Sequence, residues 1–394
     1  MLNTIRNLSA AQFIQMVDLR RHLHQYPELS FKEVNTAKRI AQELDKIGIP
    51  YHAGVGDTGI VATINPESPG PTIGIRAELD ALPIQEQTGL DYSSANPNVM
   101  HACGHDVHMA NLIGAAKILW ELRDEIKGKI LLIFQPGEEL LPGGALSIIN
   151  SDVFKQNTPD LMLGAHILPE LEAGRVGFRS GPYMASGDEV YLTVIGKGGH
   201  AAMPHTLIDP VVMASHIVLA LQQVVSRNAP IDVPTVLSFG KFIGNGATNV
   251  IPDHVHIEGT FRTMDEGWRA KAHKLIAQKA TGIAQSMGGH CEVDIRMGYP
   301  TLSNHPELTA LAKRLAREYL GEENLVDLPI RMTTDDFAHY AQSIPSVYFR
   351  VGVGFDSGEN AGLHNGKLVV NEYVMEQAGG LLAWLAIGLI GKLQ

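Results

Sequence analysis

Hydrophobic residues in the first part of the chain follow two alternating patterns. Apolar positions spaced by three or four residues predict helices over residues 9–25, 33–47, 105–126 and 144–150. Between them, short continuous apolar runs predict buried strands over residues 58–64, 72–75, 129–134 and 160–163. This alternation is typical of an α/β domain in which helices flank a mixed, mostly parallel sheet.

The pattern changes in the middle of the chain, where polar residues interrupt the apolar runs more often. The expected order is strand, helix, strand, strand, helix, strand over residues 189–195, 209–225, 235–241, 254–261, 266–287 and 291–297. That order predicts a smaller α+β, ferredoxin-like unit inserted into the first domain. A helix, a strand and a final helix follow over residues 306–318, 346–351 and 372–390. We therefore predict a discontinuous domain (1–182 and 300–394) and an inserted domain (183–299).

Charge and composition narrow the classes of function. The formal net charge of −11 argues against binding to nucleic acid or to anionic membranes. Two cysteines, Cys103 and Cys291, exclude a disulfide framework and favour a reducing compartment. The N-terminus shows no secretion signal, and the apolar run over residues 381–390 is about half the length that spans a bilayer. We expect a cytoplasmic protein whose last helix packs on the core.

Acids and imidazoles follow several of the predicted strands. Arg76, Glu78 and Asp80 follow the strand that ends at residue 75, Glu138-Glu139 follow the one that ends at 134, and His166 follows the one that ends at 163. Ligands of open α/β sheets bind outside the carboxyl ends of the strands. The sequence therefore predicts a functional site at that edge.

The Cys103-x-His105 motif is the sharpest local signal. In an extended loop, side chains two residues apart point the same way, so both could bind one metal ion. Thiolate and imidazole suit zinc, and imidazole with carboxylate also suits manganese or nickel. Gly104 would let the backbone pass close to its neighbours. The alternative is a buried thiol beside a histidine that caps a helix.

The other candidate residues each have a structural alternative. Within Glu138-Glu139, one carboxylate can bind metal while the other moves protons, or the pair is simply exposed. His166 alone fits a core histidine and His364 a turn histidine. Asp335-Asp336 fits a helix N-cap, and Ser30 with Glu33 fits a capping box. A Cys103 nucleophile with a histidine base would explain neither the Glu pair nor the 17 histidines.

Seven motifs in order then resemble a known family. They are the segments over residues 21–31, 76–83, 100–106, 134–139, 199–205, 249–253 and 259–262. Together they resemble the hippurate hydrolase and auxin-conjugate (indole-acetyl-amino acid) hydrolase branch of the dinuclear-metal aminoacylase/carboxypeptidase superfamily. The resemblance extends from about residue 20 to 390 and is carried by the order and spacing of the motifs.

The resemblance implies a metal-dependent amidohydrolase that cleaves N-acyl amino acids, such as N-acetyl or N-benzoyl amino acids. Two divalent ions (Zn, Mn or Ni) would be bound by Cys103, His105, Glu139, His166 and His364. Glu138 would be the general base that takes a proton from metal-bound water. Asp80 would orient a ligand imidazole.

The resemblance also implies roles for the inserted domain, which would be a lid and a dimerisation surface. His200 would polarise the scissile carbonyl, in the wider superfamily often from the neighbouring subunit, and Asn249 and Arg262 would bind substrate. The expected partners are a small-molecule substrate and a second copy of the chain in a homodimer or higher oligomer. Departures from the family pattern, such as Glu78 in place of Asp, bear on the substrate. A peptidase on short peptides and a non-catalytic binder are the alternatives.

Overall fold

The computed structural model describes residues 1–356, 358 and 360–393, which form two compact units. The larger unit comprises Met1–Gly181, Ser303–Ile330 and Asp336–Gln394. The inserted unit comprises Pro182–Leu302 and Arg331–Asp335. The sequence placed the boundaries near residues 182 and 300. It did not anticipate that residues 331–335 pack with the inserted unit, because a five-residue segment carries no pattern of its own.

The larger unit contains an eight-stranded mixed sheet with the strand order β1-β2-β4-β3-β5-β16-β6-β15. The central strands β4, β3, β5 and β16 are parallel to one another. The strands are β1 (Tyr51–Val55), β2 (Gly59–Ile64), β3 (Thr72–Glu78), β4 (Lys129–Gln135), β5 (Leu161–Glu172), β6 (Val176–Phe178), β15 (Leu325–Asp327) and β16 (Ser346–Gly354). The predicted mixed, mostly parallel sheet is thereby confirmed.

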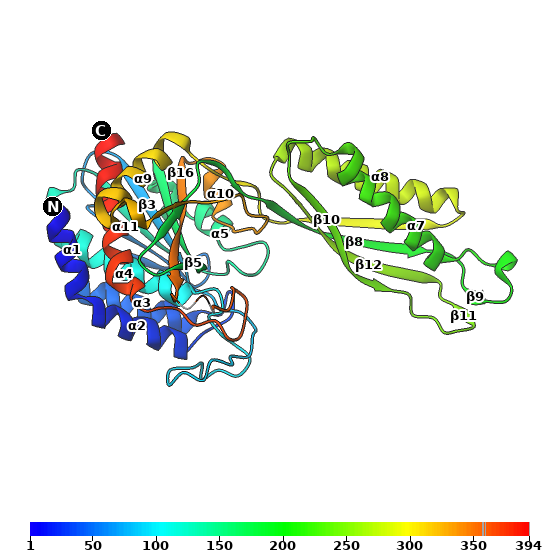
Figure 1. Cartoon of the computed structure of the whole chain (residues 1–394), viewed down its shortest axis with the longest axis horizontal. Helices are drawn as coiled ribbons and strands as arrows, with labels where there is room; N and C mark the ends of the chain where they lie inside the picture. The colour runs from blue at the N-terminus through cyan, green and yellow to red at the C-terminus, as the bar shows by residue number, and fades with distance from the viewer. Residues whose placement is uncertain (357, 359, 394) are drawn as a thin grey trace. The chain divides into compact units, whose positions relative to one another are not determined.

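Helices cover this sheet, and α4 and α11 pack against each other in the core (Figure 1). The helices are α1 (Leu2–Ala11), α2 (Phe13–Gln25), α3 (Val34–Ile47), α4 (His105–Glu121), α5 (Ala145–Asn150), α6 (Asp152–Gln156), α9 (Pro306–Leu320), α10 (Ala338–Ala341) and α11 (Val374–Leu393). Among the described residues, α11 alone is long and apolar enough to cross a membrane. Most of it is buried against α1, α4 and α9, as expected for a core helix.

The predicted capping box at the start of α3 is wrong. Glu33 is the N-cap residue itself, and its side chain makes no cap hydrogen bond, whereas the Glu28 carboxylate accepts from the N–H of Thr36 in the first turn. The Glu33 carboxylate accepts hydrogen bonds from the main-chain N–H groups of Phe31 and Gly137, and the Ser30 hydroxyl donates to Asp80. Tertiary partners have replaced the local ones that the spacing suggested.

The inserted unit is a four-stranded antiparallel sheet with the order β10-β12-β8-β13, and helices α7 and α8 pack on one face (Figure 1). Its elements are β8 (Ser186–Ile195), α7 (Pro210–Gln223), β10 (Thr235–Ile243), β12 (His254–Thr263), α8 (Glu266–Ser286) and β13 (His290–Met297). This is the predicted ferredoxin-like arrangement. Short strands β9 (Gly199–His200) and β11 (Val250–Ile251) form a small separate ladder, as do β7 (Gly181–Met184) and β14 (Leu302–Asn304).

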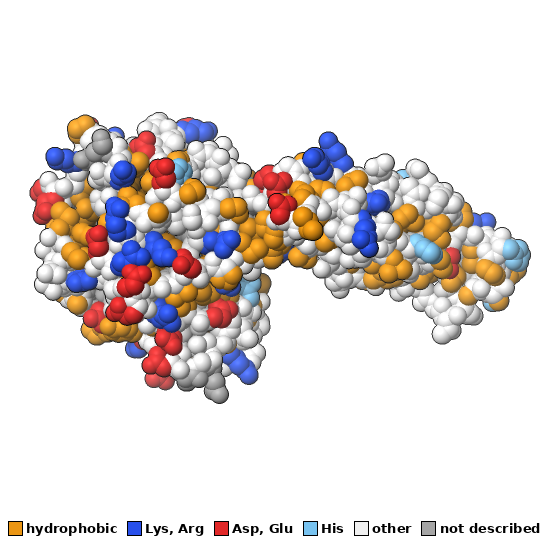
Figure 2. Space-filling view, turned by 45° about the horizontal axis from the view of Figure 1, so that its top comes forward, with side chains coloured by type: hydrophobic (Ala, Val, Ile, Leu, Met, Phe, Trp, Pro, Cys, Tyr) orange, Lys and Arg blue, Asp and Glu red, His pale blue; other side chains and the backbone are white. Residues whose placement is uncertain are grey.

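Both units expose charged and large hydrophobic side chains. On the face shown in Figure 2, basic and acidic side chains are interspersed over the larger unit. The inserted unit exposes several large hydrophobic side chains, namely Leu219, Ile231, Phe242, Ile243 and Met297. Strand β10 is also an edge of its sheet.

Candidate metal centre

The first turn of α4 brings Cys103 and His105 into the interior. His105 is the first residue of α4, and Gly104 before it adopts φ +78°. The expected extended loop is therefore wrong, because the motif is a turn that runs into a helix. A Cβ on Gly104 would lie 2.2 Å from Ile167 Cδ1, so both the backbone angle and the space require glycine.

Four segments of the larger unit bring the predicted ligands together. In each of three groups, one ligand atom per residue lies within 4.8 Å of those of the others. The groups are Cys103 with His105 and His166, Cys103 with Glu139 and His364, and His105 with Glu138 and Glu139. Cys103 belongs to two of the groups, so ions held by them would be neighbours. Glu138 is 7% exposed, whereas the side chain of His364 is 53% exposed.

The register of the sheet explains why His166 reaches this cluster. Glu78 ends β3 opposite Gln135, which ends β4, and Arg76 pairs with Gly164 of β5. His166 is therefore level with the ends of β3 and β4, although β5 continues to Glu172. The predicted strand ended too early, because pairing with β16 carries β5 past the polar His166. His166 lies within a strand and not after it.

Hydrogen bonds fix which ring nitrogen each buried histidine presents. His105 Nδ1 donates to the main-chain carbonyl of Asp80 at 2.8 Å, and the Asp80 carboxylate lies 3.3 Å away. His166 Nδ1 donates to the carbonyl of Ile167 at 2.8 Å, and its Nε2 lies 3.4 Å from Cys103 Sγ. Metal-binding histidines usually donate their second N–H to such acceptors. Both Nε2 atoms thus offer lone pairs to the centre of the cluster.

His364 and Glu139 complete the cluster from two loops. The His364 main-chain N–H donates to the carbonyl of Ala102, next to Cys103, at 2.8 Å. His364 Nε2 lies 3.2 Å from Glu139 Oε1, yet that oxygen has no hydrogen-bond partner among the described residues. His105 Nε2, 3.9 Å from the same oxygen, is likewise unpartnered in the described structure.

The electrostatics of the cluster favour a cation. Burial and the nearby carboxylates of Glu139 and Glu138 raise the pKa of the Cys103 thiol well above its usual value. Burial alone would lower the pKa of His105, but Asp80, Glu78 and Glu139 raise it to about 10. Burial and Arg350 lower the pKa of His166, so its imidazole is neutral, as a metal ligand must be.

The donor set therefore fits divalent metal. Buried polar atoms without partners are costly, and His105 Nε2 and Glu139 Oε1 face one another across the cluster. A divalent cation would satisfy both and would favour the thiolate form of Cys103. Thiolate and imidazole together suit zinc, and imidazole with carboxylate also suits manganese or nickel.

Glu78, His105 and His108 form a further group of close ligand atoms, but Glu78 and His108 are already engaged with other protein groups. His108 Nδ1 donates to Glu78 at 2.8 Å, and His108 Nε2 accepts from the Ile167 N–H at 2.9 Å. Glu78 also pairs with Arg76, and despite burial Arg76 and His108 lower the pKa of Glu78 well below its ordinary value. This group supports the edge of the sheet. The sequence did not reveal this role of His108, because a histidine three residues after His105 on a helix fits a metal ligand and a core residue equally well.

Asp336 does not cap a following helix, so the N-cap interpretation is wrong for this residue. Its carboxylate accepts from Gln135 Nε2 at 2.7 Å and from the N–H of Ala145, at the start of α5, at 2.9 Å. It also pairs with Arg76. Asp336 therefore fixes the end of β4 immediately before the turn that carries Glu138 and Glu139.

The three remaining predicted residues lie in the inserted unit. His200 and Asn249 are exposed, and His200 in β9 pairs with Val250 in β11. Arg262 lies near the end of β12, and its guanidinium donates to the carbonyl of Met332 at 3.1 Å. Arg262 forms no ion pair among the described residues.

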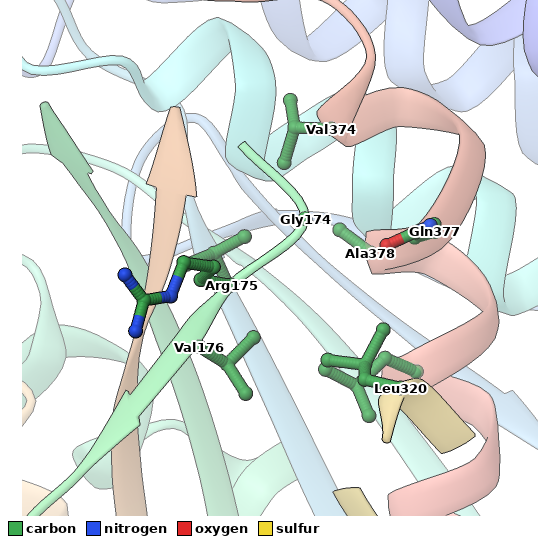
Figure 3. Close-up of a pocket in the computed structure, with 9 residues that line it drawn as sticks. Gly174, Arg175, Val176, Leu320, Val374, Gln377 and Ala378 are labelled. Carbon is green, nitrogen blue, oxygen red and sulfur yellow. The ribbon is translucent and has the colours of Figure 1, made fainter. Parts of the chain in front are cut away.

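A pocket elsewhere in the larger unit shares no residue with the cluster. It is lined mainly by apolar groups, among them Val176, Leu320 and Val374. In Figure 3 the Arg175 side chain extends away from Gln377 and Ala378, so its charge does not face the helix side of the pocket. The pocket offers no reactive group to the chemistry of the cluster.

Comparison with known proteins identifies the family of this chain. Residues 74–382 match peptidase family M20/M25/M40. The chain is 40% identical to the N-acetyl-L-cysteine deacetylase of Bacillus subtilis over 342 residues, 87% of this chain and 81% of that protein. It is 41% identical to the N-acyl-L-amino acid amidohydrolase of Geobacillus stearothermophilus over 288 residues, 73% of this chain and 77% of that protein.

A solved structure extends the similarity to the fold. The YXEP protein of Bacillus subtilis, a dinuclear metal binding peptidase from the M20 family, superposes with a TM-score of 0.84 and 32% identity. The match covers 97% of this chain and 99% of that one. The matched family and the covered lengths agree, and the chain therefore belongs to peptidase family M20/M25/M40, whose members hydrolyse amide bonds.

Proposed function

We propose that this protein hydrolyses the amide bond of N-acyl amino acids, releasing a carboxylic acid and a free amino acid. The observation that carries the proposal is the buried cluster in which Glu138 lies beside Cys103, His105, Glu139, His166 and His364. Two of the similar proteins are named for the removal of acyl groups from amino acids. Glu138 is not needed as a ligand in this set, and its carboxylate can act as the base in such a reaction.

Two divalent ions would be held by Cys103, His105, Glu139, His166 and His364. When bound, the ions supply Lewis acidity, which lowers the pKa of water and polarises a substrate carbonyl. Asp80 would keep His105 in the orientation that offers Nε2, because both its carbonyl and its carboxylate face Nδ1.

Glu138 would act as the general base and then as the general acid. It would take a proton from the attacking water as the bond between the water oxygen and the acyl carbon forms. It would then give that proton to the leaving nitrogen as the C–N bond breaks. Glu138 is buried, and its carboxylate lies within 4.8 Å of the ligand atoms of His105 and Glu139, so it is close to the proposed site of attack.

The inserted unit would bind substrate from two different ends. From His254 to Arg262, β12 extends roughly 26 Å at 3.3 Å per residue. His200 and Asn249 lie on the short β9–β11 ladder that precedes His254, whereas Arg262 lies at the other end of the strand. One small substrate cannot touch both ends of the same unit.

We therefore propose that His200 and Asn249 serve the site of a second copy of the chain, and that Arg262 binds the substrate carboxylate. Exposed Leu219, Phe242 and Ile243, with the unpaired edge of β10, offer a surface for self-association. Mixing H200A with E138Q chains tests this. Complementation should restore about a quarter of wild-type activity, since half of random dimers are mixed and each has one complete site. No restoration in confirmed mixed dimers would mean that His200 acts within its own chain.

The reaction class is tested by release of free amino acid from N-acetyl, N-benzoyl and indole-acetyl amino acids, with dipeptides in parallel. Each substrate is assayed with Zn²⁺, with Mn²⁺ and after chelation. Metal-dependent release from an N-acyl amino acid supports the proposal, and preference for the benzoyl or indole-acetyl compounds would support the hippurate or auxin-conjugate branch. Cleavage of dipeptides alone would replace it with a peptidase.

A further inference from the structure

The segment from Glu28 to Thr36, which we call the 28–36 segment, contacts the metal centre at two places. One is Asp80, which faces His105, and the other is Gly137, in the turn before the two glutamates. The segment ends in the first turn of α3, and residue 29 bridges to residue 81, just after Asp80. The Ala81 N–H also donates to the carbonyl of Glu28 at 2.8 Å. None of its side chains belongs to the ligand groups described above.

Ser30 holds the acid that faces His105. Its hydroxyl donates to Asp80 Oδ2 at 2.7 Å, and the main-chain N–H of Glu139 donates to the same oxygen at 2.9 Å. Asp80 Oδ1 is left facing His105 Nδ1 at 3.3 Å. The Ser30 hydroxyl therefore helps to fix a carboxylate that touches a ligand histidine and the backbone of a ligand glutamate.

Glu33 holds the turn that carries the two glutamates. Its side chain is completely buried, and Oε1 accepts from the N–H groups of Phe31 and Gly137, both at 2.9 Å. Oε2 accepts from the Thr58 hydroxyl at 2.6 Å. The carboxylate thus anchors the residue immediately before Glu138.

Gly137 and Phe31 fit together closely at this point. Gly137 has φ +59°, and a Cβ there would lie 2.4 Å from Phe31 Cζ. Its carbonyl accepts from the Gly144 N–H at 3.1 Å. Phe31 therefore packs against one side of the turn, and both the N–H and the carbonyl of Gly137 are hydrogen-bonded. Loss of the Glu33 contact would displace this turn and the two glutamates that follow it.

We propose that Glu33 and Ser30 are positioning residues for the metal centre. Glu33 fixes the Gly137 amide and so the direction of Glu138 and Glu139, and Ser30 fixes Asp80 and so His105. This inference rests on the proposed function, because it presumes that the cluster binds metal. It requires that loss of either contact weakens metal binding, and not merely the fold.

The test measures Zn²⁺ affinity by competition with a chromophoric chelator, together with kcat, KM and Tm. E33A should weaken Zn²⁺ binding by about 10- to 100-fold, as partners of ligands commonly do. It should also lower kcat by about 100-fold, since small misplacements of reacting groups have such effects, with KM little changed. E33Q should restore both to within about threefold of wild type, since its amide oxygen still accepts both N–H groups.

Two further variants separate positioning from stability. T36V removes a buried hydroxyl at the same helix start, but that hydroxyl donates to Glu28 at 3.0 Å and not toward the centre. It should lower Tm without changing Zn²⁺ affinity or kcat. S30A should keep a near-wild-type Tm and bind Zn²⁺ about 10-fold more weakly, and it keeps the proposal testable if E33A does not fold.

The outcomes distinguish the two proposals. Wild-type chain that binds no Zn²⁺ would overturn the proposed function and the positioning role with it. Wild-type chain that binds Zn²⁺, with S30A or folded E33A binding it equally well, would overturn the positioning role alone. Equal loss of affinity in T36V would also overturn it, because general destabilisation would then be the cause.

Discussion

Two buried charged clusters meet at the first turn of α4, and they are built differently. His105 belongs to the metal centre, whereas the next residue, Asp106, points to a cluster formed with Arg20, His24 and Glu86. Successive helical residues point about 100° apart, so one turn supplies both clusters. We call the second one the Asp106 cluster.

Opposite charges are matched in the Asp106 cluster. Asp106 lies 2.7 Å from Arg20 and 2.8 Å from His24, and His24 also faces Glu86 at 3.2 Å. Burial by itself would lower the pKa of His24. Asp106 and Glu86 nevertheless raise that pKa, because both ring nitrogens face carboxylates. Glu372 pairs in turn with Arg20 and Arg21. The opposite charges of this cluster are paired within the protein, and Asp106 Oδ1 is left without a hydrogen-bond partner among the described residues.

The metal centre combines two carboxylates, a thiol and three imidazoles, and some of its inward-facing atoms have no partner among the described residues. The comparison teaches that burial of charge does not by itself mark a ligand site. Matched charges indicate structure, whereas an excess of acid around lone pairs indicates a missing cation.

Removal of metal should have the largest effect. Chelation should abolish activity and lower Tm, because ions that bind only the folded state stabilise it by about 2.7 kcal/mol at 100 times Kd. Zn²⁺ or Mn²⁺ should restore both. The measurement is metal content, activity and Tm on the same sample. Full activity in a sample with no detectable metal would contradict the assignment of the centre.

E138Q should lower kcat by about 10²- to 10⁴-fold while both ions remain bound, because the amide cannot accept the proton. Metal content and single-turnover rates are the measurements. E125Q, at an exposed position after α4, is the matched control and should behave like wild type. Retention of near-wild-type kcat in E138Q would remove Glu138 from the role of base.

D106N should destabilise the fold and leave the metal stoichiometry unchanged. It leaves Arg20 and His24 without their shared carboxylate, and such losses cost about 3–5 kcal/mol. Urea unfolding of the metal-loaded protein measures the change, and D124N at an exposed position is the control. If D106N instead lost metal at unchanged stability, the two clusters would not be separate.

E86Q should have the smallest and most specific effect, on the pH dependence of stability. Burial by itself would raise the pKa of Glu86. The hydrogen bonds from His24, Thr88 and Ser94 outweigh burial and lower that pKa from 4.5 to about 2. A carboxyl whose pKa is lower in the folded state stabilises the fold above its unfolded pKa, and this contribution is lost as the pH falls through the folded value. The stability difference between wild type and E86Q should therefore be full above pH 4.5 and shrink toward pH 2. A difference that does not change over that range would show that Glu86 is not charged in the fold.

The features that were predictable are those that depend on local pattern. Strands β2, β3 and β4 and the α+β insert follow from short apolar runs and from helical spacing, which neighbouring residues impose on their own. The ends of β5 and the segment over residues 331–335 were not predictable, because pairing with β16 and packing on the inserted unit decide them. The capping box predicted for Ser30 and Glu33 was wrong for the same reason. Their spacing fits a local capping box, but both side chains form hydrogen bonds with residues distant in the sequence.

The sequence by itself determined the types of donor atom, the glycine before His105 and the order of elements that leads to one sheet edge. Which of the ionisable side chains have hydrogen-bond partners depends on the tertiary structure. His108 and His105 stand three residues apart on one helix, yet both ring nitrogens of His108 are engaged, whereas Nε2 of His105 has no partner among the described residues. The physical reason is that a side chain becomes a ligand through what surrounds its lone pair. That is set by strand register and by the packing of distant segments, and not by the residues next to it in the chain.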